Sequence, residues 1–307
     1  MTRSFSFTSV VIILVLLLTA LFACNGVVTQ PVNDKLQVLA TTSIVGDVVA
    51  QVGGEHIQVT VLLPLGADPH AFEPRPRDAA AIVDADIVFA NGAGLEEFLQ
   101  PLLESADSQE KLIEVSTGIA LLALVNDPEE HGGKDPHIWM DPNNVVIWTE
   151  NISTTLSAVD PEHAADYKAN AENYAASLAD LDAWIRSQVA QVAPENRLLV
   201  TDHGVFGYFA NEYGFTQVGT ITGSFSTNAA PSARELSALE DDIRSIGVKA
   251  VFVGETANDL LARQVAQDTG IKVVTIYHAS LTDANGQVPS YLEFMRYNVN
   301  AIVTALK

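Results

Sequence analysis

Residues 160–194 read DPEHAADYKANAENYAASLADLDAWIRSQVAQVAP, and this stretch decides how the rest of the chain is organised. Asp160 and Pro161 are typical of a helix start, and Pro194 is typical of a residue just past a helix end. Between them, apolar residues recur at steps of three and four: Tyr167, Ala171, Tyr174, Leu178, Leu181, Ile185, Val189 and Val192. A helix of some 32 residues would span about 48 Å, which is longer than one compact domain needs. We therefore expect residues 160–193 to form a rigid linker helix between two lobes.

The sequence before this helix alternates between strand-like and helix-like segments. The expected strands are residues 36–42, 57–63, 87–91 and 112–115, and the expected helices are residues 44–52, 78–85, 95–104 and 144–158. This alternation predicts a parallel sheet with helices on both faces. Residues 36–159 are accordingly expected to form the N-terminal lobe.

The same alternation returns after the long helix. The expected strands are residues 198–201, 217–220, 250–254 and 272–277, and the expected helices are residues 205–213, 232–246, 258–269 and 291–306. Four strands precede the long helix and four follow it. The predicted fold is therefore α/β, with two (β/α)4-type lobes built on parallel sheets, and residues 194–307 form the C-terminal lobe.

The N-terminus has the pattern of a secretory signal. Arg3 precedes an apolar run over residues 10–22, which is too short and wrongly flanked for a permanent membrane span, so we expect residues 1–23 to be a signal peptide. The stretch Leu21-Phe22-Ala23-Cys24 resembles the lipobox of bacterial lipoproteins. That resemblance implies a lipidated Cys24, a tether over residues 24–35 and an extracytoplasmic protein anchored to the membrane, in the periplasm or at the cell surface. An ordinary cleaved signal with a free cysteine is the alternative.

The composition restricts the class of partner. The chain has 38 acidic and 16 basic residues, a formal net charge of −22, and a single cysteine. This charge excludes nucleic acid as a partner, because a polyanion would be repelled and no basic cluster offsets the repulsion. One cysteine cannot form an internal disulfide, so stability must come from burial of apolar surface.

Two proline-containing turns each present a histidine. The triplet Asp68-Pro69-His70 recurs as Asp135-Pro136-His137, and proline restricts both its own backbone and that of the preceding residue, so each histidine sits in a stiff turn. His203 and Asp283 also follow expected strands. In open α/β sheets ligands bind at the carboxyl ends of the strands, so these four side chains are candidates for one site.

Three imidazoles and one carboxylate can fill a tetrahedral shell around Zn²⁺ without leaving a position for water. Such a shell binds metal and does not catalyse. A histidine taken singly is as readily explained as a solvated residue, and it is the four together that favour a metal site. His278 also lies just past the last strand and competes with Asp283 for the fourth position. The neighbouring acids Asp68, Asp135 and Asp202 either orient the imidazoles or cap the turns.

The motifs together resemble a known family. They are Asp68-Pro69-His70 with Phe72-Glu73-Pro74, Asp135-Pro136-His137-Ile138-Trp139 with Asp141-Pro142, Asp202-His203-Gly204 leading to Gly207-Tyr208-Phe209, and Asp283 with the closing helix at residues 291–298. This set resembles the zinc- and manganese-specific solute-binding proteins of bacterial ABC importers, the cluster A-I metal-binding family, over essentially the whole mature chain. The resemblance implies the metal ligands His70, His137, His203 and Asp283 between two lobes. It also implies a monomeric receptor that captures a divalent metal and delivers it to an ABC permease and its ATPase, with no enzymatic activity.

The donor set bears on the choice of metal. Some manganese members of the family place a carboxylate where His203 stands, and three nitrogens with one carboxylate favour zinc, because manganese prefers oxygen-rich shells. We therefore expect Zn²⁺ as the transported ligand, with Mn²⁺ possible. Two features depart from the family pattern. Residues 126–134 carry only His131 where many zinc members have a histidine-rich loop, and Ala230-Pro231-Ser232 replaces a common Glu-Pro-Ser.

Two rival functions use the same histidines. A lipid-anchored zinc-dependent hydrolase would need an open coordination position and a general base, for which Glu255 at a strand end is the candidate, although the sequence has no His-Glu-x-x-His pattern. A surface adhesin would hold zinc only for structure. Neighbouring genes for an ATPase and a permease would separate both rivals from the importer receptor.

Overall fold

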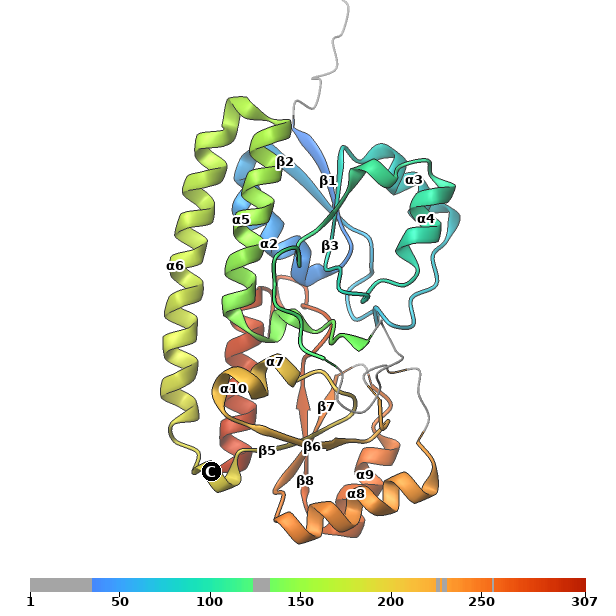
Figure 1. The fold of residues 1–307 in the computed structure, drawn as a ribbon, viewed down its shortest axis with the longest axis vertical. Helices are drawn as coiled ribbons and strands as arrows, with labels where there is room; N and C mark the ends of the chain where they lie inside the picture. The colour runs from blue at the N-terminus through green and yellow to red at the C-terminus, as the bar shows by residue number, and fades with distance from the viewer. Residues whose placement is uncertain (1–34, 124–132, 225–226, 228–230, 256) are drawn as a thin grey trace, which may run out of the picture. The chain divides into compact units, whose positions relative to one another are not determined.

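Two four-stranded sheets with the same strand order organise the computed structural model, which describes residues 35–123, 133–224, 227, 231–255 and 257–307 (Figure 1). The orders are β2-β1-β3-β4 and β6-β5-β7-β8. Every pairing within them is parallel. The expected α/β fold with two parallel sheets is confirmed. In each sheet the order reverses between two central strands, and such switch points are where ligands bind in this class of fold.

The first sheet and its helices follow the predicted segments closely. They are β1 (Leu36–Ala40), α2 (Ser43–Gly53), β2 (Ile57–Val61), α3 (Pro76–Asp84), β3 (Ile87–Ala90), α4 (Leu99–Ser105) and β4 (Leu112–Glu114). Helix α4 begins four residues later than its apolar pattern predicts. The reason is the turn before it, in which Gly92, Ala93 and Gly94 all have positive φ and the Glu96 carboxylate accepts from the backbone of Asn91.

The second sheet agrees with the prediction equally well. Its elements are β5 (Leu198–Thr201), α7 (Gly207–Tyr213), β6 (Thr216–Thr220), α8 (Ala233–Ile246), β7 (Ala250–Gly254), α9 (Leu260–Thr269), β8 (Lys272–Ile276) and α10 (Tyr291–Leu306). The short 3-10 helices of the chain include η1 (Gly54–His56), η2 (Gln109–Lys111), η4 (Ile138–Met140), η5 (Pro161–His163) and η6 (Pro194–Asn196). Short loops at the carboxyl ends of β5, β7 and β8 carry the residues of interest.

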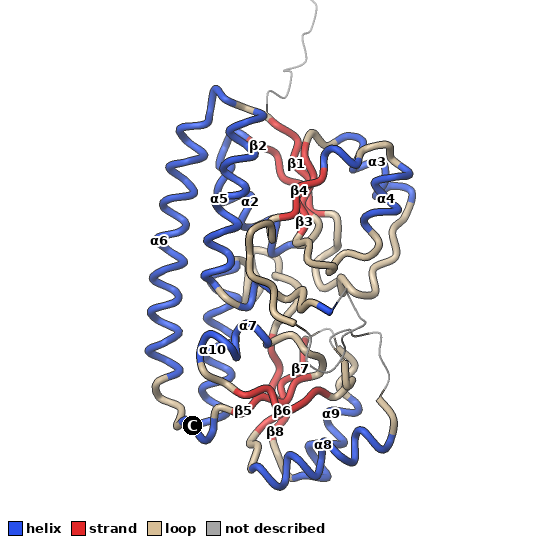
Figure 2. Tube along the Cα trace, in the orientation of Figure 1, coloured by secondary structure: helices blue, strands red, loops and turns tan. Residues whose placement is uncertain are grey.

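The long helix is α6 (Ala164–Val189), which packs against α5 (Pro142–Val159) as Figure 2 shows. It is shorter than the predicted stretch because η5 precedes it and the chain turns after Ala190. At 26 residues it spans about 39 Å. The predicted apolar stripe is confirmed, since all eight of its residues are buried. Helix α6 contacts α2 of the first sheet and α10 of the second.

Three apolar cores hold these layers together. The largest combines α2, α5, α6 and α10 with residues from both sheets, such as Phe89 of β3 and Phe252 of β7. A smaller core lies between the first sheet and α3 and α4, and another lies between the second sheet and α8 and α9. Because the largest core is continuous across both sheets, separating the lobes would expose apolar surface. The fold therefore resists a wide hinge motion.

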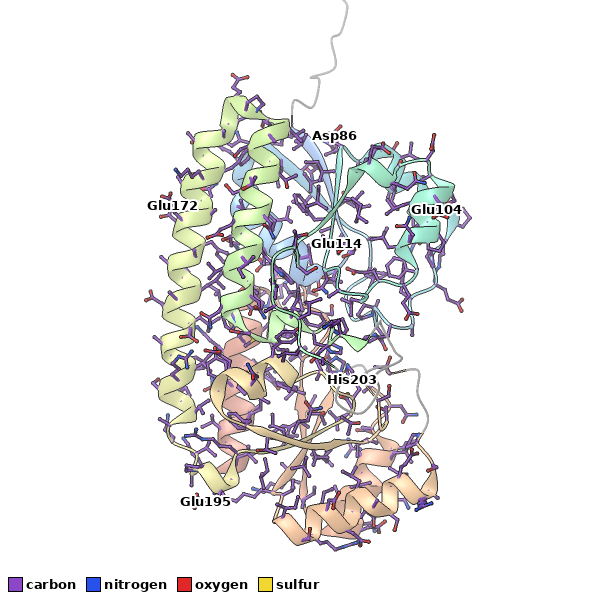
Figure 3. The ribbon with its side chains drawn as sticks, in the orientation of Figure 1. Asp86, Glu104, Glu114, Glu172, Glu195 and His203 are labelled. Atoms are coloured by element: carbon purple, nitrogen blue, oxygen red, sulfur yellow. The ribbon has the colours of Figure 1, made fainter. Side chains whose placement is uncertain are left out.

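The acidic residues labelled in Figure 3, among them Glu104, Glu172 and Glu195, lie on the outside, whereas His203 lies between the two sheets. Among the helices that the structure describes, none has the length and apolar run that a membrane crossing requires. Cys24 and the predicted signal peptide lie outside the described residues, as does His131. The described residues from Leu36 to Lys307 form one compact unit.

Candidate metal centre

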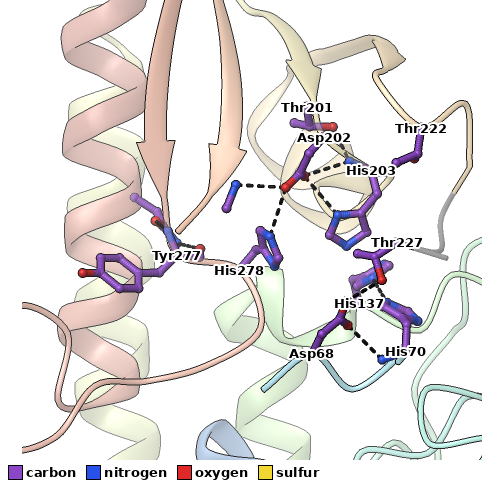
Figure 4. A network of polar contacts seen from close by, with 12 residues as sticks. Asp68, His70, His137, Thr201, Asp202, His203, Thr222, Thr227, Tyr277 and His278 are labelled. Atoms are coloured by element: carbon purple, nitrogen blue, oxygen red, sulfur yellow. Dashed lines mark hydrogen bonds and ion pairs between the residues drawn. The ribbon is translucent and has the colours of Figure 1, made fainter. Parts of the chain in front are cut away.

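The structure brings His70, His137 and His203 together (Figure 4). The Nε2 atoms of His70 and His137 lie 3.1 Å apart. The ring centroids are 5.2 Å apart for His70 and His137, 5.2 Å for His137 and His203, and 5.7 Å for His70 and His203. His137 and His203 are each 1 % exposed, and His70 is half-buried. Three predicted ligands therefore form one compact, largely dry cluster.

These separations are those of imidazoles around one tetrahedral ion. With Zn–N bonds of about 2.0–2.1 Å, two ligating nitrogens lie about 3.3 Å apart and the centroids of their rings about 5.2 Å apart. The separations in the structure fall close to both figures. Little rearrangement would be needed for the three rings to hold a metal ion.

His70 reaches the cluster from the loop between β2 and α3. The carboxylate of Asp68 accepts from the backbone N–H of His70 at 2.9 Å, which closes a tight turn around Pro69. The other oxygen of Asp68 accepts from the hydroxyl of Thr227, a residue of the second half of the chain. The turn that presents His70 is thus held from its own loop and from across the site.

His137 precedes η4 and α5 and is held more tightly. A single oxygen of Asp135 accepts from the backbone N–H of His137 at 2.9 Å and from its ring Nδ1–H at 2.8 Å. Asn91 donates to the carbonyl of Pro136, and Tyr208 donates to the carbonyl of Asp135. Because the proton sits on Nδ1, the lone pair of Nε2 faces the cluster.

His203 follows β5, and it is held in the same way as His137, by an aspartate that accepts from both its backbone N–H and its ring N–H. Oδ1 of Asp202 accepts from the backbone N–H of His203 at 2.8 Å and from its ring Nδ1–H at 3.0 Å. Burial of Asp202 disfavours its charge, but His278 and His203 outweigh this and hold the pKa of the carboxyl well below its ordinary value. Asp202 is therefore an anion that fixes the orientation of His203.

The three neighbouring acids divide between the two roles considered from sequence. Asp135 and Asp202 bind both the backbone and the ring of their histidine, so they fill both of the roles that the sequence left open. Asp68 caps the backbone of its turn. In all three cases the acid that the motif places one or two residues earlier binds the backbone N–H of the histidine, and in two of them it also binds the ring.

Asp283 is not part of this cluster. Its side chain is exposed, and its carboxylate accepts from the backbone N–H of Asn285 at 2.9 Å within its own loop. Among the described residues, the group of donors that lie within 4.8 Å of one another at this cluster consists of the three histidines and does not include Asp283. Its predicted role as the fourth ligand therefore stays a prediction.

His278, the competing residue, lies on the other side of Asp202. Its Nε2 is 3.1 Å from Oδ2 of Asp202, and its ring centroid is 4.7 Å from that of His203. Burial lowers the proton affinity of this imidazole, but the Asp202 carboxylate outweighs the effect and its pKa is raised. Asp202, His203 and His278 form the second group of close donors among the described residues.

Glu255, the candidate base of the rival hydrolase, follows β7. Burial raises its pKa, partly offset by the charge of His278. Within the described part of the chain it belongs to neither group of close donors. A cavity of about 320 Å³ adjoins the cluster and is lined in part by Asp68, Asp202, His203 and His278. It provides room beside the imidazoles for an ion to approach.

Several contacts around the site were not foreseen from the sequence. The indole Nε1–H of Trp139 donates to the carbonyl of His278 at 3.0 Å, and the hydroxyl of Tyr291 donates to the carbonyl of Trp139. Ser43 and Ser280 place their hydroxyl oxygens 3.3 Å apart across 237 positions. Ser43 and Tyr291 are the first residues of α2 and α10, and Ser280 lies shortly after β8, which is the signal that could have identified these three.

A family model matches residues 38–305 of the chain, and its description is zinc-uptake complex component A, periplasmic. A manganese-binding lipoprotein, MntA of Halalkalibacterium halodurans, is 34% identical over 299 residues, which cover 97% of each chain. The manganese-bound structure of a periplasmic metal-binding protein from Candidatus Liberibacter asiaticus is 29% identical with a TM-score of 0.80, covering 89% of this chain and 100% of the other.

A further structure is similar in fold. The periplasmic zinc-binding protein TroA of Treponema pallidum has a TM-score of 0.82 at 23% identity and covers 89% of this chain and 99% of its own. Its likeness independently supports the arrangement of two parallel sheets beside a long helix.

Proposed function

Because the chain belongs to the family of periplasmic zinc-uptake component A proteins, we propose that His70, His137 and His203 bind the metal ion that it carries. The protein is a metal-binding substrate receptor of an ABC importer and not an enzyme, so the hydrolase and the adhesin are not favoured. The observation that supports the site is the set of ring separations, 5.2, 5.2 and 5.7 Å, which suits a single ion.

The site draws its donors from both halves of the chain. His70 and His137 belong to the loops around the first sheet, and His203 follows the first strand of the second. A small displacement between these loops would remove one donor from the ion and weaken its binding. Because the shared core opposes a wide hinge motion, we propose that local loop shifts suffice for release to the permease.

For the metal itself we propose zinc as the tighter ligand. Three imidazole nitrogens suit Zn²⁺, whereas Mn²⁺ prefers more oxygen donors and a higher coordination number. The relative from Halalkalibacterium halodurans is named for manganese, so a direct comparison of the two ions is the informative measurement. Tighter binding of Mn²⁺ than of Zn²⁺ would overturn this preference.

The experiment that tests the site begins with protein purified without added metal. Elemental analysis should find about one divalent transition metal ion per chain, and stripping with EDTA should lower the melting temperature, since binding stabilises the folded state. Competition between Zn²⁺ and Mn²⁺ then ranks the metals. A melting temperature that EDTA leaves unchanged in protein that still contains metal would contradict the proposal.

We propose Asp283 as a fourth donor that joins only when its loop moves. If so, Asp283→Ala should weaken Zn²⁺ binding clearly, whereas Asn285→Ala in the same exposed loop should not. Equal Zn²⁺ affinities for the wild type and Asp283→Ala would mean that the three histidines are the only ligands that the protein supplies to the ion.

We further propose that Cys24 carries a lipid that holds a monomeric receptor at the membrane. Cys24→Ala should then release the protein from the membrane fraction without altering the metal affinity of the folded part. Light scattering of the soluble form should give the mass of one chain. Continued membrane association of Cys24→Ala would contradict the anchor.

A further inference from the structure

Asp202 is bound on both of its oxygens. Oδ1 accepts from the backbone and ring of His203, and Oδ2 accepts from the backbone N–H of Gly254 at 2.9 Å and lies 3.1 Å from Nε2 of His278 (Figure 4). The carboxylate therefore links two imidazoles that lie 75 positions apart, one in the proposed metal cluster and one outside it. Its plane cannot rotate without breaking contacts on both sides.

The chain makes specific room for His278. A Cβ atom at position 254 would lie 1.6 Å from Nε2 of His278, so only glycine lets the imidazole lie against the end of β7. The backbone beside His278 is also held, because Asn298 exchanges two hydrogen bonds with Tyr277. The whole residue is 2 % exposed. The packing against Gly254 and the hydrogen bonds of the adjacent Tyr277 backbone therefore fix the position of the His278 imidazole.

The geometry separates His278 from the three clustered histidines. Its Nε2 is directed to Asp202, and within the described part of the chain its ring contacts that of His203 but not those of His70 or His137. The donor group that contains His278 shares only His203 with the proposed metal cluster. Any effect of His278 on a metal ion at that cluster should therefore pass through Asp202 or through its contact with His203, and not through His70 or His137.

We propose that His278 is a positioning residue for the metal site, whose Nε2–H holds Asp202 in the orientation that keeps the proton of His203 on Nδ1 and its Nε2 lone pair toward His70 and His137. This inference rests on the proposed function for its effect on metal binding. A carboxylate such as Asp202, bound to the ring of a ligating imidazole, raises its basicity and restricts its rotation, and loss of such a partner typically costs about 10–100-fold in metal affinity. Because His278 acts one hydrogen bond further out, its loss should fall at the low end of that range.

The first test needs no metal. Nitrogen-15 NMR of the metal-free protein should show His203 as the Nδ1–H tautomer in the wild type and a mixture of tautomers in His278→Ala. His278→Gln, whose side-chain N–H can still donate to Asp202, should restore the Nδ1–H form. An unchanged His203 spectrum in folded His278→Ala would overturn the proposal, whether or not the protein binds metal. Should His278→Ala not fold, His278→Leu, which fills more of the space and cannot donate to Asp202, provides the same comparison with His278→Gln.

The second test is a double-mutant cycle read by Zn²⁺ titration. His278→Ala should weaken binding about tenfold, and His278→Gln should regain most of the loss. Because His278 acts through Asp202, the pair Asp202→Ala/His278→Ala should bind no more weakly than Asp202→Ala alone. Additive losses would instead show that His278 acts independently of Asp202 and would overturn the positioning role.

A matched control separates this effect from loss of any buried imidazole. His56 is also partly buried and paired with an aspartate, since its Nε2 lies 2.9 Å from Asp166, but it lies outside both donor groups. His56→Ala should leave the His203 tautomer and the Zn²⁺ affinity unchanged. If wild-type protein binds no Zn²⁺ while the tautomer responds as expected, the proposed function fails and the positioning of His203 stands.

Discussion

Nε2 of His70 and Nε2 of His137 lie 3.1 Å apart although 67 positions separate the two residues in the chain. Two unprotonated imidazole nitrogens at this distance would repel each other through their lone pairs, so a proton or a metal cation must lie between them. His137 already donates its Nδ1–H to Asp135, so in the neutral pair the shared proton comes from His70. A divalent ion that replaces this proton would bind both rings and reach His203 as well.

Removal of a clustered imidazole should abolish tight binding. We expect His137→Ala to weaken Zn²⁺ binding by at least about 100-fold. Removing a ligating side chain should reduce the metal affinity at least as much as removing a residue that only orients such a side chain. Titration with a competing chelator measures the change. His131→Ala, which alters a histidine outside the predicted ligand set, is the control and should bind as the wild type does. Identical titration curves for the two variants would remove His137 from the site.

Replacing an aspartate that accepts a hydrogen bond from a ligating histidine should reduce the Zn²⁺ affinity less than removing the histidine itself. Asp135→Asn keeps the size of the side chain but weakens the hydrogen bond to Nδ1 of His137, so we expect about a tenfold loss of Zn²⁺ affinity. Asp68→Asn should cost less, since Asp68 binds the backbone of His70. Calorimetric titration of both variants makes the comparison, and a larger loss for Asp68→Asn would contradict it.

Metal affinity should decrease as the pH is lowered. Each histidine must be neutral to donate a lone pair, and an ordinary imidazole titrates near a pKa of about 6.5. Protons therefore compete with the ion, and the apparent Kd for Zn²⁺ should rise by more than about tenfold between pH 7.5 and pH 5.5. Titrations in buffers that do not bind zinc test this. A constant Kd over that range would mean that the imidazoles do not hold the ion.

Glu96 should make the fold less stable as the pH rises. Its buried carboxyl group accepts hydrogen bonds from the hydroxyl of Thr41 and from the backbone N–H groups of Asn91 and Gly92. Burial nevertheless raises its pKa from 4.5 to about 7. Between these two values the folded chain keeps a proton that the unfolded chain has lost, so the free energy of unfolding falls as pH rises from about 4.5 to about 7. Above that window the slope from this group disappears.

Urea unfolding of the wild type and Glu96→Gln at pH 5, 6, 7 and 8 measures this slope. The glutamine cannot titrate, so the stability of the variant relative to the wild type should increase with pH, by at most about 1.4 kcal/mol per pH unit and mainly below pH 7. Parallel stability curves for the two proteins would show that Glu96 is not protonated in the folded state.

Much of the fold follows from local patterns. The apolar stripe of α6 is buried residue for residue, and each predicted strand appears with at most small changes at its ends. Helix α4 begins late because the Glu96 side chain binds the turn before it, and a side-chain contact of this kind leaves no trace in periodicity. Boundaries are therefore less predictable than the elements themselves.

The sequence by itself determined the alternation of strands and helices, the long helix and the stiff Asp-Pro-His turns, because steric limits and apolar periodicity act over a few neighbouring residues. Only the tertiary structure decided which donors converge. It gathered His70, His137 and His203, left Asp283 in an exposed turn of its own, and placed His278 behind Asp202. Those outcomes depend on how loops from two sheets pack together, and sequence spacing does not encode the direction of a side chain across such a distance.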